Sequence, residues 1–172
     1  MRKQIAAFTL IIFLLVPVST YSQWAAGLSA NLKNDNPQKG IGFTISRALP
    51  FQFPLAGFRI RIDGILFDQT IRRPTTTLSE KNVHVSLEGI LFLKLFQPYA
   101  MISAGYGWLK ANDNHKGSFL TGSAAGLQFA VFHPVYPYLE ARAVQYIEPL
   151  SKGVSNAKDF QITGALGVKI EF

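Results

Sequence analysis

The feature that most constrains the fold of this chain is a strict alternation of apolar residues, clearest in the stretch FQITGALGVKIEF at 160–172. A repeat of two residues predicts a β-strand with one apolar face, because successive side chains point to opposite sides of a strand. The same alternation recurs after the first 22 residues, and no segment shows a convincing stripe with the 3.6-residue period of a helix. The sequence therefore predicts an all-β fold.

The composition indicates what surrounds these apolar faces. Hydrophobic residues make up 48% of the chain and charged residues only 16%, whereas soluble domains carry about 25% charged residues. Beyond the N-terminus no run is long and apolar enough for a membrane-spanning helix, which needs roughly 20 residues. A chain that is too apolar for water but lacks such a run is typical of a transmembrane β-barrel, in which apolar residues occupy every second position.

The segment 1–22 has the pattern of a secretory signal peptide. Arg2 and Lys3 precede an apolar run over 5–18, and small residues follow it. This pattern predicts cleavage after the segment and one β-barrel domain over 23–172. A retained membrane anchor is the alternative, but the run is short and a proline interrupts it. The domain is thus expected outside the cytoplasm, and no run of Lys and Arg is dense enough to predict a nucleic acid partner.

Eight strands follow from the alternation and from the turn-forming residues between them. We expect them at about 23–33, 40–48, 56–68, 82–96, 98–109, 119–132, 137–147 and 159–172. An even number of strands, with long polar loops alternating with short turns, predicts an eight-stranded antiparallel up-and-down barrel with both ends on the periplasmic side. The stretch 69–82 is expected to be the longest outer loop. The connection 49–57 is long and apolar, which a short turn does not explain.

The residues opposite the apolar face distinguish a membrane barrel from a soluble, lipocalin-like one, which is the alternative. They are charged on three of the expected strands and mainly small on three others, a combination that suits a narrow lumen because long polar side chains need space opposite them. Buried charges must pair, since an unpaired one is costly. We therefore expect one paired network in the lumen, formed by Arg59, Arg61, Asp63, Glu88, Glu140 and Arg142, with Lys94, Lys169 and Glu171 also pointing inward.

Three segments resemble strands of the small eight-stranded outer-membrane barrels, the OmpA/OmpX-like, porin-family group: QPYAMISAGYGW at 97–108, YLEARAVQYI at 138–147 and the closing 160–172. The resemblance implies this architecture and an outer-membrane location, but no particular activity. It also implies that Gly167, Ile170 and Phe172 form the signal read by the barrel assembly machinery, although Ala165 stands where a polar residue is usual. The implied partners are that machinery, periplasmic chaperones, outer-membrane lipid and lipopolysaccharide, and the barrel is expected to be a monomer.

We expect no catalytic site, no metal and no cofactor. The chain has no cysteine, which excludes disulfides and thiolate chemistry, and no glycine-rich phosphate loop or metal-spaced cluster appears. His84-Val85-Ser86 resembles the His-x-Ser pair of the lipid A deacylases, but Leu87 stands where that family has Asn. His84 and Ser86 share the polar parity of their strand with Glu88, which favours a role in lining the lumen. A lipid A-modifying enzyme is the alternative, and it requires both residues to face lipid.

The sequence thus predicts an integral outer-membrane barrel with a side-chain-plugged lumen and a structural or adhesin-like role; a narrow channel or small-ligand carrier is a further alternative. Trp24, Tyr106 and Trp108 are expected at the membrane interfaces. The outer loops are mildly basic, most densely in IRRP at 71–74. Candidates for contact with lipopolysaccharide phosphates are therefore Arg72, Arg73 and Lys81.

Overall fold

Eight β-strands make up the computed structural model over the residues that it describes, which are 24–34, 38–53, 55–72, 75–111, 114–130, 132–148 and 160–172. The expected signal peptide at 1–22 lies outside them. The strands are β1 (Trp24–Lys33), β2 (Lys39–Phe53), β3 (Ala56–Arg72), β4 (Thr75–Leu91), β5 (Phe96–Ala111), β6 (Asn114–Phe129), β7 (Val135–Tyr146) and β8 (Phe160–Glu171). Among the described residues, no helix is long and apolar enough to cross a membrane.

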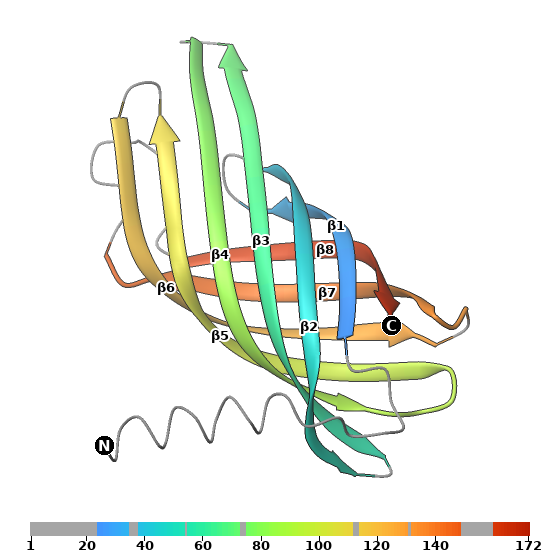
Figure 1. Cartoon of the computed structure of the whole chain (residues 1–172). Coiled ribbons are helices and arrows are strands. Elements are labelled where there is room, and N and C mark those ends of the chain that lie inside the picture. The colour runs from blue at the N-terminus through green and yellow to red at the C-terminus, as the bar shows by residue number, and fades with distance from the viewer. Residues whose placement is uncertain are drawn as a thin grey trace, which may run out of the picture.

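The strands close into one antiparallel barrel, in which each strand pairs with its neighbours in sequence and β8 pairs with β1 (Figure 1). The closing register runs from Ala25 opposite Glu171 to Lys33 opposite Thr163. The start of β1 and the end of β8 therefore lie at one end of the barrel, together with the β2–β3, β4–β5 and β6–β7 turns. We call this the turn end and the opposite one the loop end. The predicted eight-stranded up-and-down barrel is confirmed.

Apolar side chains cover the outer wall of the barrel, and mainly polar ones line its lumen. On β8 the two sets alternate: Phe160, Ile162, Leu166, Val168 and Ile170 are exposed, whereas Gln161, Thr163 and Lys169 are buried. An apolar surface of this extent is unfavourable in water and suits the hydrocarbon of a membrane. The soluble, lipocalin-like alternative is therefore wrong, because it requires the apolar faces to point inward.

The strands reach further toward the loop end than the sequence predicts. β3 and β4 are each 17 residues long and stay paired up to Arg72 and Thr75, so the expected loop at 69–82 is wrong. Its threonines at 75–77 suit a strand as well as a loop. β5 and β6 likewise run into the expected loop at 110–118. The β3–β4 and β5–β6 hairpins form the tallest part of the wall (Figure 1).

At the turn end, the apolar connection 49–57 is mostly strand as well. β2 continues to Phe53, and its register against β3 shifts between Ala48, which lies opposite Arg59, and Gln52. Such an irregularity lets a strand bend while the hairpin continues beyond it. The length of this segment is therefore explained by an extended hairpin and not by a long turn.

Lys94 does not point into the lumen, contrary to the expectation from its parity. β4 ends at Leu91, and the β4–β5 turn occupies 92–95, where Lys94 is exposed. The expected turn around Gln97 is instead the start of β5. Alternation along a sequence assigns a side chain to a face only within a strand. Because the expected strand extended beyond Leu91, the alternation assigned Lys94 to the lumen although it lies in the turn.

Inward-facing tyrosines lie against glycines on the neighbouring strands. A Cβ atom on Gly126 would lie 2.3 Å from the ring of Tyr99, which is opposite it in the β5–β6 register. A Cβ atom on Gly167 would lie 2.5 Å from the ring of Tyr138 in the same way. Atoms do not approach so closely, so these rings occupy the space that the glycines leave. The small residues expected in the lumen thus make room chiefly for aromatic rings.

We expect Gly126→Ala to destabilise the barrel by about 1–3 kcal/mol, because the added carbon must displace the Tyr99 ring or the carbonyl oxygen of Leu139, 2.6 Å away. Gly64→Ala on the outer wall is the matched control, since a Cβ atom there has nothing within 4 Å. Urea unfolding in lipid vesicles measures both variants. Equal losses of stability would contradict this account of the packing.

Candidate functional site: the charge network of the lumen

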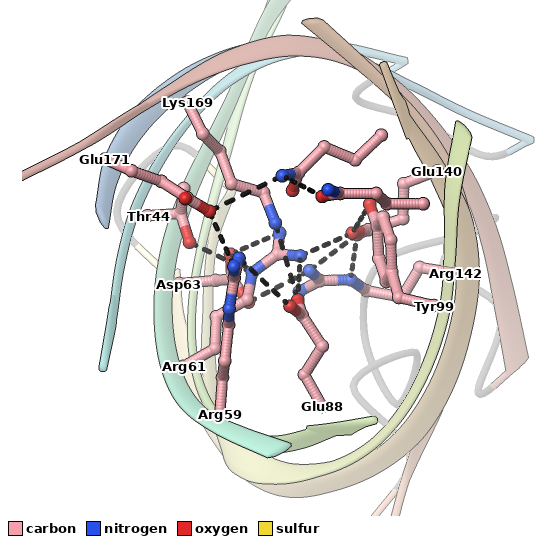
Figure 2. Close-up of polar contacts among 12 residues, drawn as sticks. Thr44, Arg59, Arg61, Asp63, Glu88, Tyr99, Glu140, Arg142, Lys169 and Glu171 are labelled. Atoms are coloured by element: carbon pink, nitrogen blue, oxygen red, sulfur yellow. Dashed lines mark hydrogen bonds and ion pairs between the residues drawn. The ribbon is translucent and has the colours of Figure 1, made fainter. Parts of the chain in front are cut away.

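Arg61 of β3 lies in the lumen and connects several strands through its guanidinium (Figure 2). Its Nε donates hydrogen bonds to Asp63 at 2.8 Å and to Thr44 at 2.9 Å, and its Nη1 lies 2.7 Å from the carboxylate of Glu140 on β7. The residue is only 2% exposed. A buried guanidinium is costly without partners, and here it has three carboxylates, those of Asp63, Glu88 and Glu140, and one hydroxyl within hydrogen-bond distance.

Arg142 of β7 pairs with the same two carboxylates. Its Nη2 lies 3.0 Å from Asp63 and 2.8 Å from Glu140, and the hydroxyl of Tyr99 donates to Glu140 at 2.9 Å. Asp63 and Glu140 therefore each lie between two arginines. Since β3 and β7 are four strands apart in a closed barrel of eight, these contacts cross the full width of the lumen.

Glu88 of β4 links this central group to side chains nearer the turn end. Its carboxylate lies 3.3 Å from Arg61, 3.5 Å from Lys169 and 3.9 Å from Arg59. Arg59 in turn pairs with Glu171 at 2.6 Å. One carboxylate thus serves three cations from β3 and β8, and the side chain of Glu88 is completely buried.

Lys169 of β8 is the cation that depends most on Glu88. The two arginines that contact Glu88 each have another carboxylate, whereas Glu88 is the only ion-pair partner of Lys169 among the described residues. The Nζ atom of Lys169 also lies 4.8 Å from the ring of Tyr99 and 5.3 Å from the ring of Tyr138. Two aromatic faces and one carboxylate therefore hold this fully buried ammonium.

The structure brings all six residues expected in the lumen into one connected set of ion pairs and hydrogen bonds. They are Arg59, Arg61, Asp63, Glu88, Glu140 and Arg142. Two tyrosines, Tyr99 and Tyr138, belong to this set although the expected network did not contain them. Their parity was a usable signal, because Tyr99 and Tyr138 lie two residues before the inward-facing Met101 and Glu140.

A second polar cluster lies nearer the loop end and centres on Glu80 of β4, which is completely buried. Its carboxylate pairs with Lys33 of β1 and accepts hydrogen bonds from Asn82 at 2.8 Å and Tyr146 at 2.9 Å. This cluster was not predicted, because Glu80 fell in the segment 69–82, expected to be a loop, and Lys33 was the last residue of an expected strand. Extending the polar parity of β4 backward from His84 was the signal that could have found it.

His84 and Ser86 point into the lumen and not toward lipid. They are 1% and 3% exposed, and neither the nitrogens of His84 nor the Oγ of Ser86 forms a hydrogen bond within the described part of the chain. The Ser–His pair that nucleophilic catalysis needs is therefore not formed. Across the described ranges, no group of three or more His, Cys, Asp or Glu side chains is placed to hold a metal ion.

The candidate phosphate contacts do not form one patch in the described structure. Arg72 ends β3 opposite Thr75, whereas Lys81 lies opposite Leu66, six residue pairs nearer the turn end. Lys81 is exposed on the outer wall. Arg73 lies outside the described residues.

The residues of the expected assembly signal lie at the closing seam of the barrel. Gly167 accommodates the ring of Tyr138, and Ile170 and Phe172 are exposed on the outer wall. Phe172 exchanges two backbone hydrogen bonds with Trp24, of 2.9 and 3.2 Å. Both aromatic residues therefore lie together at the turn end.

We expect Glu88→Ala to cost about 3–5 kcal/mol of stability, because it leaves a buried cation without a carboxylate. The contacts identify this cation as Lys169. Adding Lys169→Met should recover part of the loss, since it removes the unpaired charge. Urea unfolding of the three proteins in lipid vesicles measures the effect. An unchanged midpoint for Glu88→Ala, or a double variant no more stable than the single one, would contradict this expectation.

Comparison of the sequence with protein-family models finds no match, and comparison with curated proteins finds none either. Solved structures do match. Neisserial surface protein A has a TM-score of 0.59 at 14% identity, over 87% of this chain and 96% of that one. Ail of Yersinia pestis, in complex with the heparin analogue sucrose octasulfate, has a TM-score of 0.59 at 14% identity, over 87% and 97%.

The outer membrane enzyme PagL also matches, with a TM-score of 0.52 at 13% identity over 86% of this chain and 99% of that one. At such identities the likeness concerns the fold alone. It agrees with the closed register of the strands, the apolar outer wall and the polar lumen. The chain therefore has the fold of the small eight-stranded outer-membrane β-barrels.

Proposed function

We propose that this chain is an integral outer-membrane β-barrel with a lumen plugged by side chains, and that its role is structural or surface-interacting and not catalytic. The observation that carries the proposal is the buried ion-pair network inside an apolar wall. The wall needs hydrocarbon around it, and a lumen filled with paired charges has little space for water. Export to that membrane is proposed to depend on the segment 1–22.

Polar contacts at three heights support a closed lumen. The cluster around Glu80 lies nearest the loop end, and the group around Arg61 lies below it. At the turn end, Arg59 pairs with Glu171, and the side-chain amide of Gln128 donates to Gln97 at 3.0 Å. An eight-stranded barrel encloses little more space than its side chains fill. A narrow channel is therefore the less favoured alternative.

The tall side of the barrel supports a role at the cell surface. β3 and β4 each have 17 residues, and a strand of that length, tilted by about 40°, rises roughly 42 Å. The apolar band of such barrels is about 25 Å high, so part of these hairpins extends beyond the membrane on the loop side. One structural neighbour, Ail, is an attachment invasion locus protein. We propose a surface interaction of this general kind here.

No observation favours the alternative of a lipid A-modifying enzyme. That alternative requires His84 and Ser86 to face lipid, and both are buried in the lumen. The likeness to PagL is one of fold at 13% identity, and a fold shared at this level does not carry its chemistry.

The refolded protein should give no steady conductance in planar bilayers, because paired side chains cross the lumen. Its migration on unheated and heated gels provides a separate control, since a folded barrel is expected to migrate differently before and after heating. A heat-modifiable protein that nevertheless conducts steadily would refute the plugged lumen while leaving the barrel intact. A protein that is not heat-modifiable would refute the barrel itself.

We also propose that Gly167, Ile170 and Phe172 are read by the barrel assembly machinery. Phe172→Ala should then lower the amount of folded barrel in the outer membrane several-fold, because it removes the exposed aromatic recognition group. Phe160→Ala is the matched control, because Phe160 lies at the other end of β8 and is also exposed. It should leave the amount of folded barrel nearly unchanged. Membrane fractionation and unheated gels measure both. Similar losses in the two variants would contradict a signal at Phe172.

A further inference from the structure

A groove of about 760 Å³ lies on the outer wall near the loop end of β3, β4, β5 and β6. We call it the lysine groove. The lining residues that matter here are Asp68, Ser79, Lys81, Trp108, Lys110 and Lys116. Together they place lysine side chains and an indole ring side by side at the edge of the apolar outer wall.

Two of the lysines are diagonal neighbours across the β4–β5 pair. Lys81 lies opposite Trp108, and Lys110 lies two residues nearer the loop end, opposite Ser79. Diagonal neighbours are about 7–8 Å apart at the backbone, so two flexible lysine side chains can reach one anion between them. Both are exposed, and neither takes part in the ion pairs of the described part of the chain.

The charge of the groove is positive. Lys116 also lines it, whereas Asp68 is the only carboxylate in its lining. Asp68 lies opposite Ser79 in the β3–β4 register, on the side of the groove away from β5 and β6. The two exposed ammonium groups of Lys81 and Lys110 outnumber this carboxylate and favour an anionic ligand, and phosphate is an anion that lysine binds well.

An aromatic cluster begins at Trp108 in the groove and extends from it toward the turn end. The ring of Tyr106 is 4.8 Å from that of Trp108 and 5.1 Å from that of Phe119, both in edge-to-face geometry. Trp108 is 47% and Phe119 66% exposed. Tyrosine and tryptophan are enriched where a membrane protein passes from hydrocarbon to water. The groove therefore straddles that boundary, with Lys110 on the water side and Lys81 level with the indole of Trp108 at the lipid edge.

We propose that the lysine groove binds the phosphate group of a membrane glycolipid, with Lys81 and Lys110 pairing with the phosphate and Trp108 packing against the lipid. The proposal rests on the proposed function, because it needs the loop end to face the outer leaflet. It deepens that function by placing the phosphate contact at Lys81 and Lys110 on the side wall, and not in the basic stretch 71–74. A lipid phosphate fits both features of the groove, whereas a soluble anion uses the lysines alone.

Trp108 can report binding directly. The chain has two tryptophans, so Trp24→Phe leaves Trp108 as the only one. The refolded Trp24→Phe protein in neutral detergent micelles is titrated with bisphosphorylated lipid A, and the emission of Trp108 is followed. We expect a saturable change with bisphosphorylated lipid A and a much weaker one with its dephosphorylated form. Equal responses to the two lipids would overturn the proposal, because the phosphate would then play no part.

The matched variants test the lysines. In the same background, Lys81→Gln with Lys110→Gln should raise the apparent Kd for bisphosphorylated lipid A by at least about tenfold, because both phosphate partners are removed. Lys39→Gln with Lys94→Gln removes two exposed lysines outside the groove and should change the Kd by less than about twofold. Equal weakening in the two pairs would mean a general charge effect and would overturn the site.

Two soluble competitors test the source of the anion. Inorganic phosphate and a heparin oligosaccharide are each added to the lipid-bound protein. Competition only at concentrations far above that of lipid A supports a lipid phosphate as the ligand. Displacement at a concentration similar to that of lipid A overturns it, in favour of a free phosphate or a sulfated polysaccharide. Heat-modifiable migration of every variant shows that the barrel is intact, so failure of the groove is distinguishable from failure of the proposed function.

Discussion

The pairing of β1 with β8 is the constraint on which the rest of this structure depends. In hydrocarbon a backbone N–H or C=O group finds no water, so a sheet that crosses a membrane cannot keep an open edge. The nine residue pairs from Ala25–Glu171 to Lys33–Thr163 remove that edge. Once the sheet is closed on eight strands, every side chain faces either the surroundings or a narrow lumen. The alternation along β8 is the direct consequence.

The narrow lumen then determines which side chains can fill it. Backbone pairing joins each strand only to its two neighbours, whereas the contacts of Arg61 and Arg142 join β3 to β7 across the lumen. Ion pairs across the lumen oppose a flattening of the barrel. Backbone pairing between adjacent strands does not, because it links each strand only to its neighbours. The space they require is limited, and glycines supply part of it: Gly126 and Gly167 let tyrosine rings lie close to the wall. Charged pairs and tyrosine–glycine pairs are therefore two ways in which side chains fill the same narrow lumen.

Sequence alone predicted the faces of the strands well and their ends poorly, for a physical reason. Lipid on one side and a packed lumen on the other impose a period of two, so Arg61 and Glu140 could be assigned to the lumen without a structure. Strand ends have no such constraint, because outside the membrane a polar strand and a polar loop have similar composition. Glu80 was therefore assigned to a loop, and its pair with Lys33 was missed. Lys94 was misplaced by the same uncertainty at the turn end.

The sequence also could not predict which cation each carboxylate pairs with. Glu88 meets side chains from β3 and β8 at once, and this depends on the register and tilt around the whole barrel. Parity identifies Lys169 as an inward residue, but it does not show that Glu88 is its partner. The network could therefore be predicted as a set of residues, and not as a set of pairs.

The two ends of the barrel differ in how apolar they are, and this difference determines how far each end extends beyond the membrane. At the turn end, Leu55 and Leu95 are 67% and 55% exposed, in turns where water would favour polar residues. At the loop end the apolar wall stops near Leu66, which lies opposite Lys81. From Leu55, just before β3, to Leu66 within it, the climb is roughly 29 Å at a tilt of about 40°, close to the apolar band of about 25 Å. The apolar band therefore reaches down to the turns, which accounts for the apolar composition of 49–57. The surplus length of β3 and β4 must then extend entirely from the loop side.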